Sequence, residues 1–243
     1  MKQLQDKIAI VTGASSGIGK SIATAFAAEG ASVVLASRRK EKLDEVAAAI
    51  RGKGGIARVV LTDVTVEAQV SSLFEEVREQ FGRLDILVNN AGISQGGPPD
   101  EISLETWQRV VDLNLTAPFL CSREAFRLMK LQRSGRIINI GSVSAKVPRP
   151  QSAPYTSTKF GLEGLTRSLA LDGREFGIAA SVIQPGNTES EIWIGKESVA
   201  NQEGIMPADE LTRVIVTMAA LPPEVNVLES TVLPVSMPFV GRG

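Results

Sequence analysis

Short apolar runs and longer amphipathic segments alternate along the chain. The short runs are rich in β-branched residues, which is typical of strands buried on both faces of a sheet. The fourth run is very apolar, and this places it at the centre of the sheet. The expected strands are Lys7–Thr12, Ser32–Ser37, Ile56–Leu61, Leu84–Asn89, Arg136–Gly141, Ala180–Ile183 and Leu228–Leu233.

The segments between these runs carry apolar residues at helical spacing and predict helices. Ser103 is expected to cap the fourth helix, and Pro207 opens the last one at a favourable first-turn position. The pattern predicts an α/β, doubly wound (Rossmann) fold: a seven-stranded, mostly parallel sheet with helices on both faces, in a single domain over residues 1–243. The expected helices run at about Gly17–Gly30, Arg39–Arg51, Val66–Phe81, Ser103–Leu131, Pro154–Phe176 and onward from Pro207.

The 243-residue chain has a formal net charge of -1 and therefore lacks the excess of positive charge that binds nucleic acid or an anionic membrane surface. Its longest apolar stretches fall far short of the ~18 to 20 residues that span a bilayer. The N-terminal residues lack the apolar core and the small-residue cleavage site of a secretory signal. We therefore expect a cytoplasmic protein without nucleic-acid or membrane partners.

Three residue counts restrict the chemistry. The chain has no histidine, one cysteine (Cys121) and one tyrosine (Tyr155). Catalytic triads, Cys–His pairs and zinc sites built on histidine or on several thiolates are thereby excluded. A base that acts near neutral pH must be Lys, Asp, Glu, Tyr or a cofactor, and we expect no metal site.

A glycine-rich segment, Thr12–Gly19, connects the first expected strand to its helix. The missing side chains at Gly13 and Gly17 let the backbone approach a pyrophosphate, and Gly19 lets the helix pack closely on the strand. The alternative is a turn that merely needs positive φ angles. The position of the glycine-rich segment, after the first of several strands that alternate with helices, favours a dinucleotide site. The expected cofactor-binding residues here are Gly13, Ser15, Ser16, Gly17, Ile18 and Gly19.

The second expected strand ends in Ser37, Arg38 and Arg39, where NAD-binding folds usually place a carboxylate for the ribose 2′-hydroxyl. A guanidinium suits a 2′-phosphate instead, so NADP(H) is the preferred cofactor, with NAD(H) possible. Alternatively, the two arginines are an ordinary solvated helix entry. Asp63 and Val64 follow the third strand and are expected to contact the cofactor. Asp63 either accepts a hydrogen bond from the adenine amine or caps a helix.

Tyr155 and Lys159 lie four residues apart in a helical pattern and project from one face. A phenol has a pKa of ~10, but a cation within ~4 to 6 Å lowers the pKa of an acid by roughly one to three units. The pair is therefore a candidate acid/base. A Tyr–Lys pair at this spacing is also common on helices that have no catalytic role.

Two polar residues accompany this pair. Ser142 ends the fifth strand, at the edge where open parallel sheets bind ligands, and its hydroxyl is placed to bond a substrate carbonyl oxygen. As a lone residue it would more often be part of a turn. Asn114 lies inside the long fourth helix, where asparagine is mildly unfavourable without a role. It either holds a water molecule or faces solvent.

These residues, in this order, resemble the classical short-chain dehydrogenases/reductases. The likeness extends continuously from about Lys7 to Gly186 and more loosely beyond, and the combined motifs are highly specific. The residues that carry it are Gly13, Gly17, Gly19, the run Asn89-Asn90-Ala91-Gly92, Asn114, Ser142 thirteen residues before Tyr155, Lys159, and Pro185-Gly186.

The resemblance implies a hydride transfer between C4 of a nicotinamide and the carbon of a ketone or secondary alcohol. Tyr155 would be the acid/base and Ser142 would orient the carbonyl. Lys159 would lower the pKa of the tyrosine and bind the ribose, and Asn114 would hold a water in a proton relay. A 3-oxoacyl-thioester reductase or another carbonyl reductase acting on a small molecule is the expected type of enzyme.

The resemblance also assigns further cofactor contacts. Asn89, Asn90, Ala91 and Gly92 would shape the floor of the cofactor groove, and the backbone near Thr188 would meet the carboxamide. Pro185 and Gly186 belong to the same set, and Ser190 stands where the family often has a threonine.

The chain departs from the family pattern in two places. The substrate loop, at about residues 187–206, is short, and Trp193 between Ile192 and Ile194 either lines the pocket or belongs to ordinary packing. The C-terminus lacks a glycine-rich ending.

The apolar C-terminal residues Met237, Phe239 and Val240 are expected to be exposed and are candidates for packing on a neighbouring subunit. The resemblance favours a homotetramer or dimer. A different reading is a non-catalytic dinucleotide-binding sensor or scaffold. The retention of Asn114, Ser142, Tyr155 and Lys159 argues against it.

Overall fold

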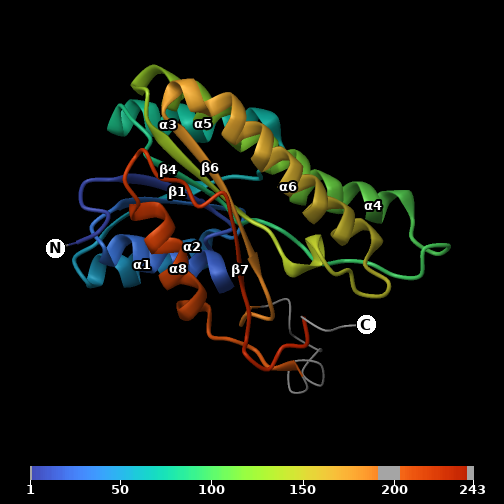
Figure 1. Ribbon diagram of the computed structural model, residues 1–243. Coiled ribbons are helices and arrows are strands. Elements are labelled where there is room, and N and C mark those ends of the chain that lie inside the picture. The colour runs from blue at the N-terminus through green and yellow to red at the C-terminus, as the bar shows by residue number, and fades with distance from the viewer. Residues whose placement is uncertain (1, 191–202, 240–243) are drawn as a thin grey trace.

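A parallel sheet forms the centre of the protein (Figure 1). The computed structural model describes residues 2–190 and 203–239. Within them the strand order is β3-β2-β1-β4-β5-β6-β7, and every neighbouring pair is parallel, so the expected mostly parallel sheet is parallel throughout. The strands are β1 (Ile8–Thr12), β2 (Ser32–Ser37), β3 (Ile56–Leu61), β4 (Ile86–Asn89), β5 (Gly135–Ile140), β6 (Ile178–Pro185) and β7 (Glu229–Val232).

The apolar content of each strand follows its place in the sheet. All residues of β1 and β4 are buried, because both faces of these inner strands are covered by helices. The edge strands β3 and β7 are only partly buried. The prediction that the very apolar fourth run is central is confirmed, since β4 is the middle strand of the seven.

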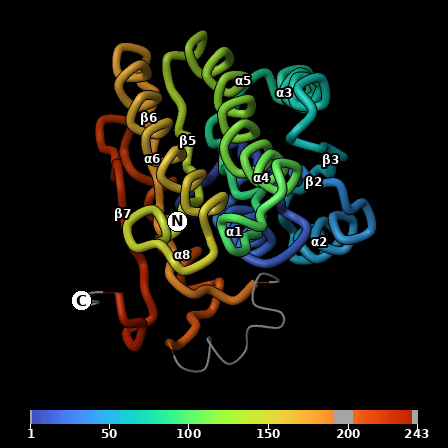
Figure 2. The backbone as a smooth tube through the Cα atoms, turned by 90° about the vertical axis from the view of Figure 1, so that its right-hand side faces the viewer, coloured from blue at the N-terminus to red at the C-terminus, as the bar shows by residue number. Residues whose placement is uncertain are grey.

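Helices cover both faces of the sheet (Figures 1 and 2). One layer packs on a core of residues from α1, α2, α8 and the sheet, and the other on a core that includes α3 and α5. The first layer contains α1 (Gly17–Ala28), α2 (Lys40–Gly52) and α8 (Ala208–Ala220). The second contains α3 (Glu67–Phe81), α4 (Leu104–Val111), α5 (Ala117–Gln132) and α6 (Ala153–Gly173).

The long helix expected over Ser103–Leu131 is interrupted. A π-helical turn, η1 (Asp112–Thr116), separates α4 from α5 and contains Asn114. The predicted cap is confirmed, because the Ser103 hydroxyl accepts a hydrogen bond from the Thr106 N–H at 3.1 Å. Pro207 is the residue before α8 rather than its first residue.

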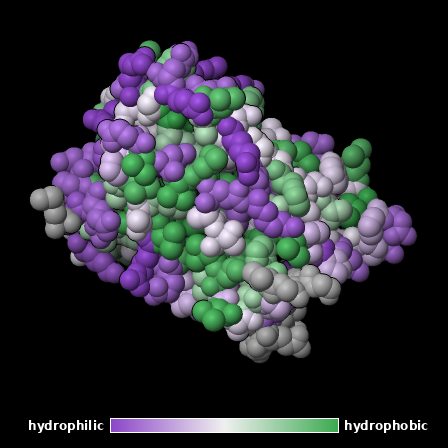
Figure 3. Space-filling view, viewed as in Figure 1, coloured by the Kyte–Doolittle hydropathy of each residue, from purple (hydrophilic) through white to green (hydrophobic). Residues whose placement is uncertain are grey.

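The end of the described chain returns to the sheet. The expectation that Met237 is exposed is wrong: it is buried, and a Cβ placed on Gly186 would lie 2.7 Å from its sulfur. Phe239 is half-buried. Apolar side chains do gather on the surface near α8 and β7 (Figure 3), where Val225 and Leu228 are exposed. Ile192, Trp193, Ile194 and Val240 lie outside the described residues.

Candidate active site

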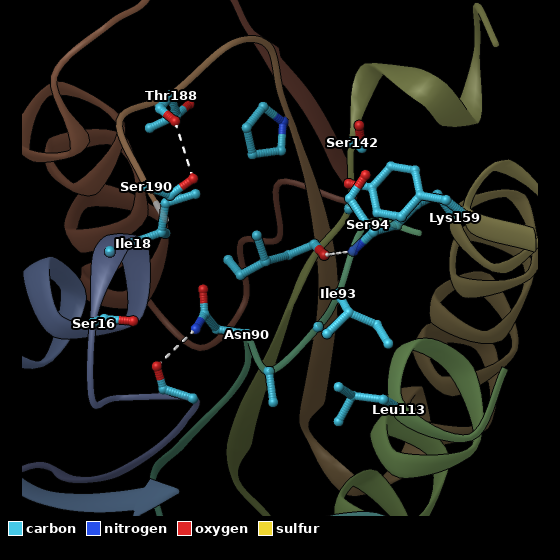
Figure 4. A pocket seen from close by; sticks show the side chains of 18 of the residues that line it. Ser16, Ile18, Asn90, Ile93, Ser94, Leu113, Ser142, Lys159, Thr188 and Ser190 are labelled. Carbon is cyan, nitrogen blue, oxygen red and sulfur yellow. Dashed lines mark hydrogen bonds between the residues drawn. The ribbon is translucent and has the colours of Figure 1, made fainter. Parts of the chain in front are cut away.

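A cavity of about 640 Å³ opens at the carboxyl ends of the strands. It lies where the strand order reverses between β1 and β4, which is the crevice in which open α/β sheets bind ligands. Figure 4 shows Ser16, Ile18, Thr188 and Ser190 on one side of it and Ser142 and Lys159 on the other. The expected site residues that line it are Gly13, Ser15, Ser16, Gly17, Ile18, Ser37, Arg38, Arg39, Asp63, Val64, Ala91, Gly92, Ser142, Tyr155, Lys159, Pro185, Gly186 and Thr188.

The glycine-rich turn needs glycine for two different reasons. Gly13 and Gly17 have φ angles of +65° and +52°, a left-handed conformation that favours glycine. Gly19 has no room for a side chain, because a Cβ would collide with the Gly13 carbonyl and the Asn90 amide. Ser190 packs over the turn, with its Cβ 3.1 Å from where a Cβ on Gly17 would be.

The turn leads directly into the N-terminus of α1. The Ser16 side chain does not cap this helix, and its first turn contains no acidic residue. Gly17 and Ile18, its first two residues, line the cavity. Such an N-terminus attracts an anion through its free N–H groups and the helix dipole.

The expected groove residues Asn89 and Asn90 lie on opposite sides of the chain. Asn89 is buried and its amide donates to Asn139 at 2.8 Å and to Ser122 at 3.0 Å, so its side chain lies below the cavity lining and its contact with a cofactor stays a prediction. Asn90 lines the cavity and donates to the Thr12 carbonyl at 3.0 Å. Side chains alternate along an extended chain, which explains why neighbouring asparagines have separate positions.

Basic residues surround the end of the cavity beside β2. Arg39 donates to the Ser15 hydroxyl at 2.9 Å and to the Ser16 hydroxyl at 2.5 Å, and thereby braces the glycine-rich turn. The Arg38 guanidinium is 68% exposed and lies 3.5 Å from the Asp63 carboxylate. Arg38 is therefore accessible from the cavity.

Asp63 also organises its own turn. Its carboxylate accepts from the Thr65 N–H at 3.0 Å and from the Thr65 hydroxyl at 2.6 Å. It is not the helix cap, because the residue before α3 is Val66. Burial alone would raise the pKa of Asp63, but the Thr65 hydrogen bonds and Arg38 outweigh it and lower the pKa.

The opposite end of the cavity brings together Ser142, Tyr155 and Lys159. The Lys159 ammonium lies 5.5 Å from the centre of the Tyr155 ring and donates to the Ile140 carbonyl at 2.8 Å. The Ser142 side chain interacts with the Tyr155 phenol and lowers its pKa. The sequence prediction that these three residues gather at one place is confirmed by this geometry.

Burial has the largest effect on the acidity of this cluster. Burial raises the pKa of Tyr155, and the interaction with Ser142 opposes this shift only in part. Burial also lowers the pKa of Lys159 to about 8. In this structure removal from water dominates for the phenol, and the Lys159 ammonium donates to the Ile140 carbonyl. The expected depression of the tyrosine pKa by Lys159 stays a prediction.

Asn114 is buried beside the cavity rather than in it. Its amide accepts from the Ile93 N–H at 2.9 Å and donates to the Ile93 carbonyl at 2.8 Å, and it also lies 3.3 Å from the Thr158 hydroxyl. The solvent-facing alternative is therefore wrong. Asn114 fixes the segment after β4 to the helix that carries Tyr155, and its role in a water relay stays a prediction.

Sequence reasoning missed an ion pair at the rim of the cavity. Arg149 lines the cavity, pairs with Glu203, and donates to the Asn187 side chain at 3.2 Å. These residues are 38 and 54 positions apart. They belong to no spacing pattern or motif, so only the fold brings them together.

The charge of the cavity is predominantly basic. Among the described residues that line it, Arg38, Arg39, Arg149 and Lys159 are basic and Asp63 is acidic. The described part of the chain contains no group of three or more His, Cys, Asp or Glu residues suited to a metal ion. Within the same residues, no helix is long and apolar enough to cross a membrane.

Comparison with known proteins gives consistent matches. The chain matches the short chain dehydrogenase family over residues 7–200. An uncharacterized oxidoreductase of Bacillus subtilis is 38% identical over 213 residues, which cover 88% of this chain and 83% of that protein. A 3-oxoacyl-(acyl-carrier-protein) reductase of Synechocystis is 41% identical over 187 residues, 76% of each protein.

A solved structure shares nearly the whole fold. The structure of a metagenomic short-chain oxidoreductase in complex with NADP matches with a TM-score of 0.85 and 33% sequence identity. The match covers 96% of this chain and 98% of that chain.

Proposed function

The chain belongs to the short-chain dehydrogenase family, and from this premise we propose that it transfers a hydride between NADP(H) and a ketone or secondary alcohol. It is an oxidoreductase that acts on CH–OH or C=O groups. One observation carries the proposal: a single cavity has the glycine-rich turn at one end and Ser142, Tyr155 and Lys159 at the other.

The residues present fit a dinucleotide. The tight turn at Gly13 and Gly17, the uncapped start of α1 and the predominance of basic side chains suit a pyrophosphate. Lys159 and the backbone near Thr188 would hold the nicotinamide end. When bound, the cofactor supplies or accepts the hydride.

The protein's own residues would handle the proton. In the reductive direction the Tyr155 hydroxyl donates its proton to the substrate oxygen, while the Ser142 hydroxyl donates a hydrogen bond to the same oxygen. In the oxidative direction the phenolate takes the proton back. The buried Lys159 ammonium would stabilise that phenolate and bind the ribose, and a pKa of about 8 lets it exchange a proton near neutral pH.

Three observations support NADP(H) over NAD(H). No carboxylate occupies Ser37–Arg39, Arg38 is largely exposed at the cavity, and a structural neighbour was solved with NADP. A guanidinium binds a phosphate through charge-assisted hydrogen bonds.

The wider setting of the enzyme belongs to the same proposal. We expect one domain over residues 1–243, a cytoplasmic location and a small carbonyl or alcohol substrate of the kind that the Synechocystis relative's name indicates. The exposed Val225 and Leu228 beside β7 support a homo-oligomer, a dimer or tetramer. Light scattering of the purified protein measures the oligomeric state.

Tyr155→Phe tests the proposal. The variant keeps the ring but loses the phenolic proton, so it should bind NADPH as the wild type does and lose at least about 100-fold in kcat. A panel of ketones and alcohols, assayed with both cofactors, supplies the substrate. If the wild type binds NADPH but transfers no hydride to any member of the panel, the protein is a non-catalytic dinucleotide sensor instead.

A further inference from the structure

A buried glutamine on β6 supports the backbone of Ser142. The Ser142 N–H donates to the Gln184 side-chain carbonyl at 2.7 Å, and the preceding Gly141 N–H donates to the Ile183 carbonyl at 2.7 Å. Gln184 is fully buried. The segment that carries Ser142 is therefore fixed to β6 by one backbone bond and one side-chain bond in succession.

Gly141 leaves the space that this contact needs. A Cβ on Gly141 would collide with the Gln184 amide oxygen. The φ angle of Gly141 does not lie in the left-handed region, so glycine is required here by the close approach of the amide. The Ser142 hydroxyl is fixed as well, because it accepts from the Ser144 N–H at 3.1 Å.

The other end of the Gln184 amide points to the helix that carries Tyr155. Its NH₂ group donates to the Glu163 carboxylate at 3.4 Å. Glu163 follows Tyr155 by eight residues and Lys159 by four, which places all three on one face of α6. Gln184 thus connects the backbone of Ser142 to the helix of Tyr155.

Glu163 is held in place by two cations. Lys146 and Arg167 each lie 2.7 Å from its carboxylate, and both also pair with Glu229 on β7, at 2.8 and 3.0 Å. Burial alone would raise the pKa of Glu163, but the hydrogen bonds from Lys146 and Arg167 outweigh it and lower the pKa. The carboxylate is consequently ionised at neutral pH and acts only as an acceptor.

This arrangement requires an amide at position 184. The side chain at 184 accepts from the Ser142 N–H and faces the ionised Glu163 carboxylate, to which only a donor can hydrogen-bond. Glutamine provides both an acceptor and a donor from one side chain, whereas an ionised glutamate provides only acceptors.

We propose that Gln184, oriented by Glu163, is a positioning residue that sets Ser142 against Tyr155 for proton transfer. This inference rests on the proposed function, because it assigns Ser142 and Tyr155 to the reaction. Gln184 itself does not line the cavity in the described residues, so it acts through Ser142.

Gln184→Met is the first test, since methionine has a similar length and no hydrogen-bonding amide. We expect kcat to fall by roughly 10- to 100-fold, as when a reacting group is displaced, with the Kd for NADPH unchanged. Ser181→Ala is the matched control: Ser181 is buried in the same strand and loses one side-chain hydrogen bond, to Asn226 at 2.8 Å, away from the cavity. It should keep the kcat of the wild type.

Gln184→Glu adds a readout that a purely structural role would not change. Two carboxylates would then face each other, and only protonation of one restores a donor between them. We expect kcat relative to the wild type to rise as the pH falls. In the double variant Gln184→Glu with Glu163→Gln, the amide at 163 donates to the carboxylate at 184, and kcat should recover at neutral pH.

Tyr155 gives a readout that needs no turnover. It is the only tyrosine in the chain, so the ultraviolet absorbance of phenolate after a rapid pH jump reports its pKa alone. The interaction with the Ser142 side chain lowers this pKa. If Gln184 positions Ser142, Gln184→Met raises the pKa of Tyr155, whereas Ser181→Ala leaves it unchanged.

The outcomes separate the two proposals. An unchanged Tyr155 pKa in a folded Gln184→Met variant, or a loss of kcat no larger than in Ser181→Ala, overturns the role of Gln184. If the wild type transfers no hydride but the Tyr155 pKa responds to Gln184→Met, the proposed reaction fails while the positioning contact stands.

Discussion

Lys159 is buried in the protein, and its ammonium has the Ile140 carbonyl as its hydrogen-bond partner. Burial lowers its pKa from 10.5 to about 8, a difference that corresponds to roughly 3 kcal/mol of folding free energy. Below pH 8 Lys159 is protonated in both the folded and the unfolded protein. Burial of the ammonium then destabilises the folded protein by the full amount. Between pH 8 and 10.5 the unfolded chain binds more protons than the folded one, so the stability of the protein rises with pH.

Lys159→Met should therefore stabilise the fold while removing activity. After about 1 kcal/mol is subtracted for the lost hydrogen bond to Ile140, we expect a gain of about 2 kcal/mol at pH 7. The gain should shrink as the pH approaches 10.5. Urea unfolding of both proteins at pH 7 and pH 10 measures this gain. A loss of stability at pH 7 would contradict the conclusion that burial of the ammonium destabilises the fold.

Arg38 is predicted to select the cofactor. Arg38→Asp removes the cation and places a carboxylate where a ribose 2′-hydroxyl would bind, so NADH should acquire a lower KM than NADPH. The exposed ion pair with Asp63 contributes little to stability, so the fold should be kept. Lys42→Asp is the control, because it makes the same change of charge on an exposed face of α2. If Arg38→Asp still has a lower KM for NADPH than for NADH, Arg38 does not determine the choice of cofactor.

The positions of single residues can be predicted from the sequence where their spacing along a helix decides which side chains share a face. Tyr155 and Lys159 share a helix face because they are four positions apart, and the structure places them together with Ser142. The direction of the Tyr155 pKa shift was not predictable, since it depends on burial that no spacing reveals. The burial of Asn89 was not predictable either, because it depends on the packing of β4 against α5 and β5.

The π-helical turn is the element that carries Asn114. The extra residue in such a turn lets a side chain leave the regular helical surface, which explains an asparagine within a long helix. Asn114→Leu would leave the Ile93 N–H and carbonyl without their side-chain partner. We expect a loss of about 2–4 kcal/mol in unfolding free energy.

Urea unfolding checks this value against Gln108→Leu. Gln108 is exposed on α4, where its side chain donates to Asp112 at 2.8 Å. An exposed pair of this kind contributes only a few tenths of a kcal/mol. Equal losses in the two variants would show that the Asn114 contacts do not support the segment after β4.

Two helical glycines should respond in opposite directions to alanine. A Cβ on Gly164, within α6, meets nothing within 4 Å, so Gly164→Ala should stabilise the protein by about 0.5–1 kcal/mol. A Cβ on Gly19 would collide with the Gly13 carbonyl, so Gly19→Ala should distort the turn and weaken NADPH binding. Thermal unfolding and cofactor titration of both variants test this contrast, which fails if both alanines have the same effect.

At the scale of the whole molecule, the alternation of apolar runs and amphipathic segments was sufficient to predict the layers. The strands buried on both faces are those with continuous apolar runs. The contacts of Gln184 with Glu163 and of Arg149 with Glu203 were not predicted, because they join segments that only the finished sheet brings together. Met237 was misjudged for the same reason, since its burial depends on Gly186.

The strand order also has a consequence for synthesis. β1 pairs with β2 on one side, but on the other side Ala9 pairs with Ile86, a residue that leaves the ribosome much later. A nascent chain that ends before β4 therefore presents the apolar edge of β1, which invites pairing with other chains. Until residues 86–89 have emerged, we expect this edge to make the growing polypeptide prone to association with its neighbours.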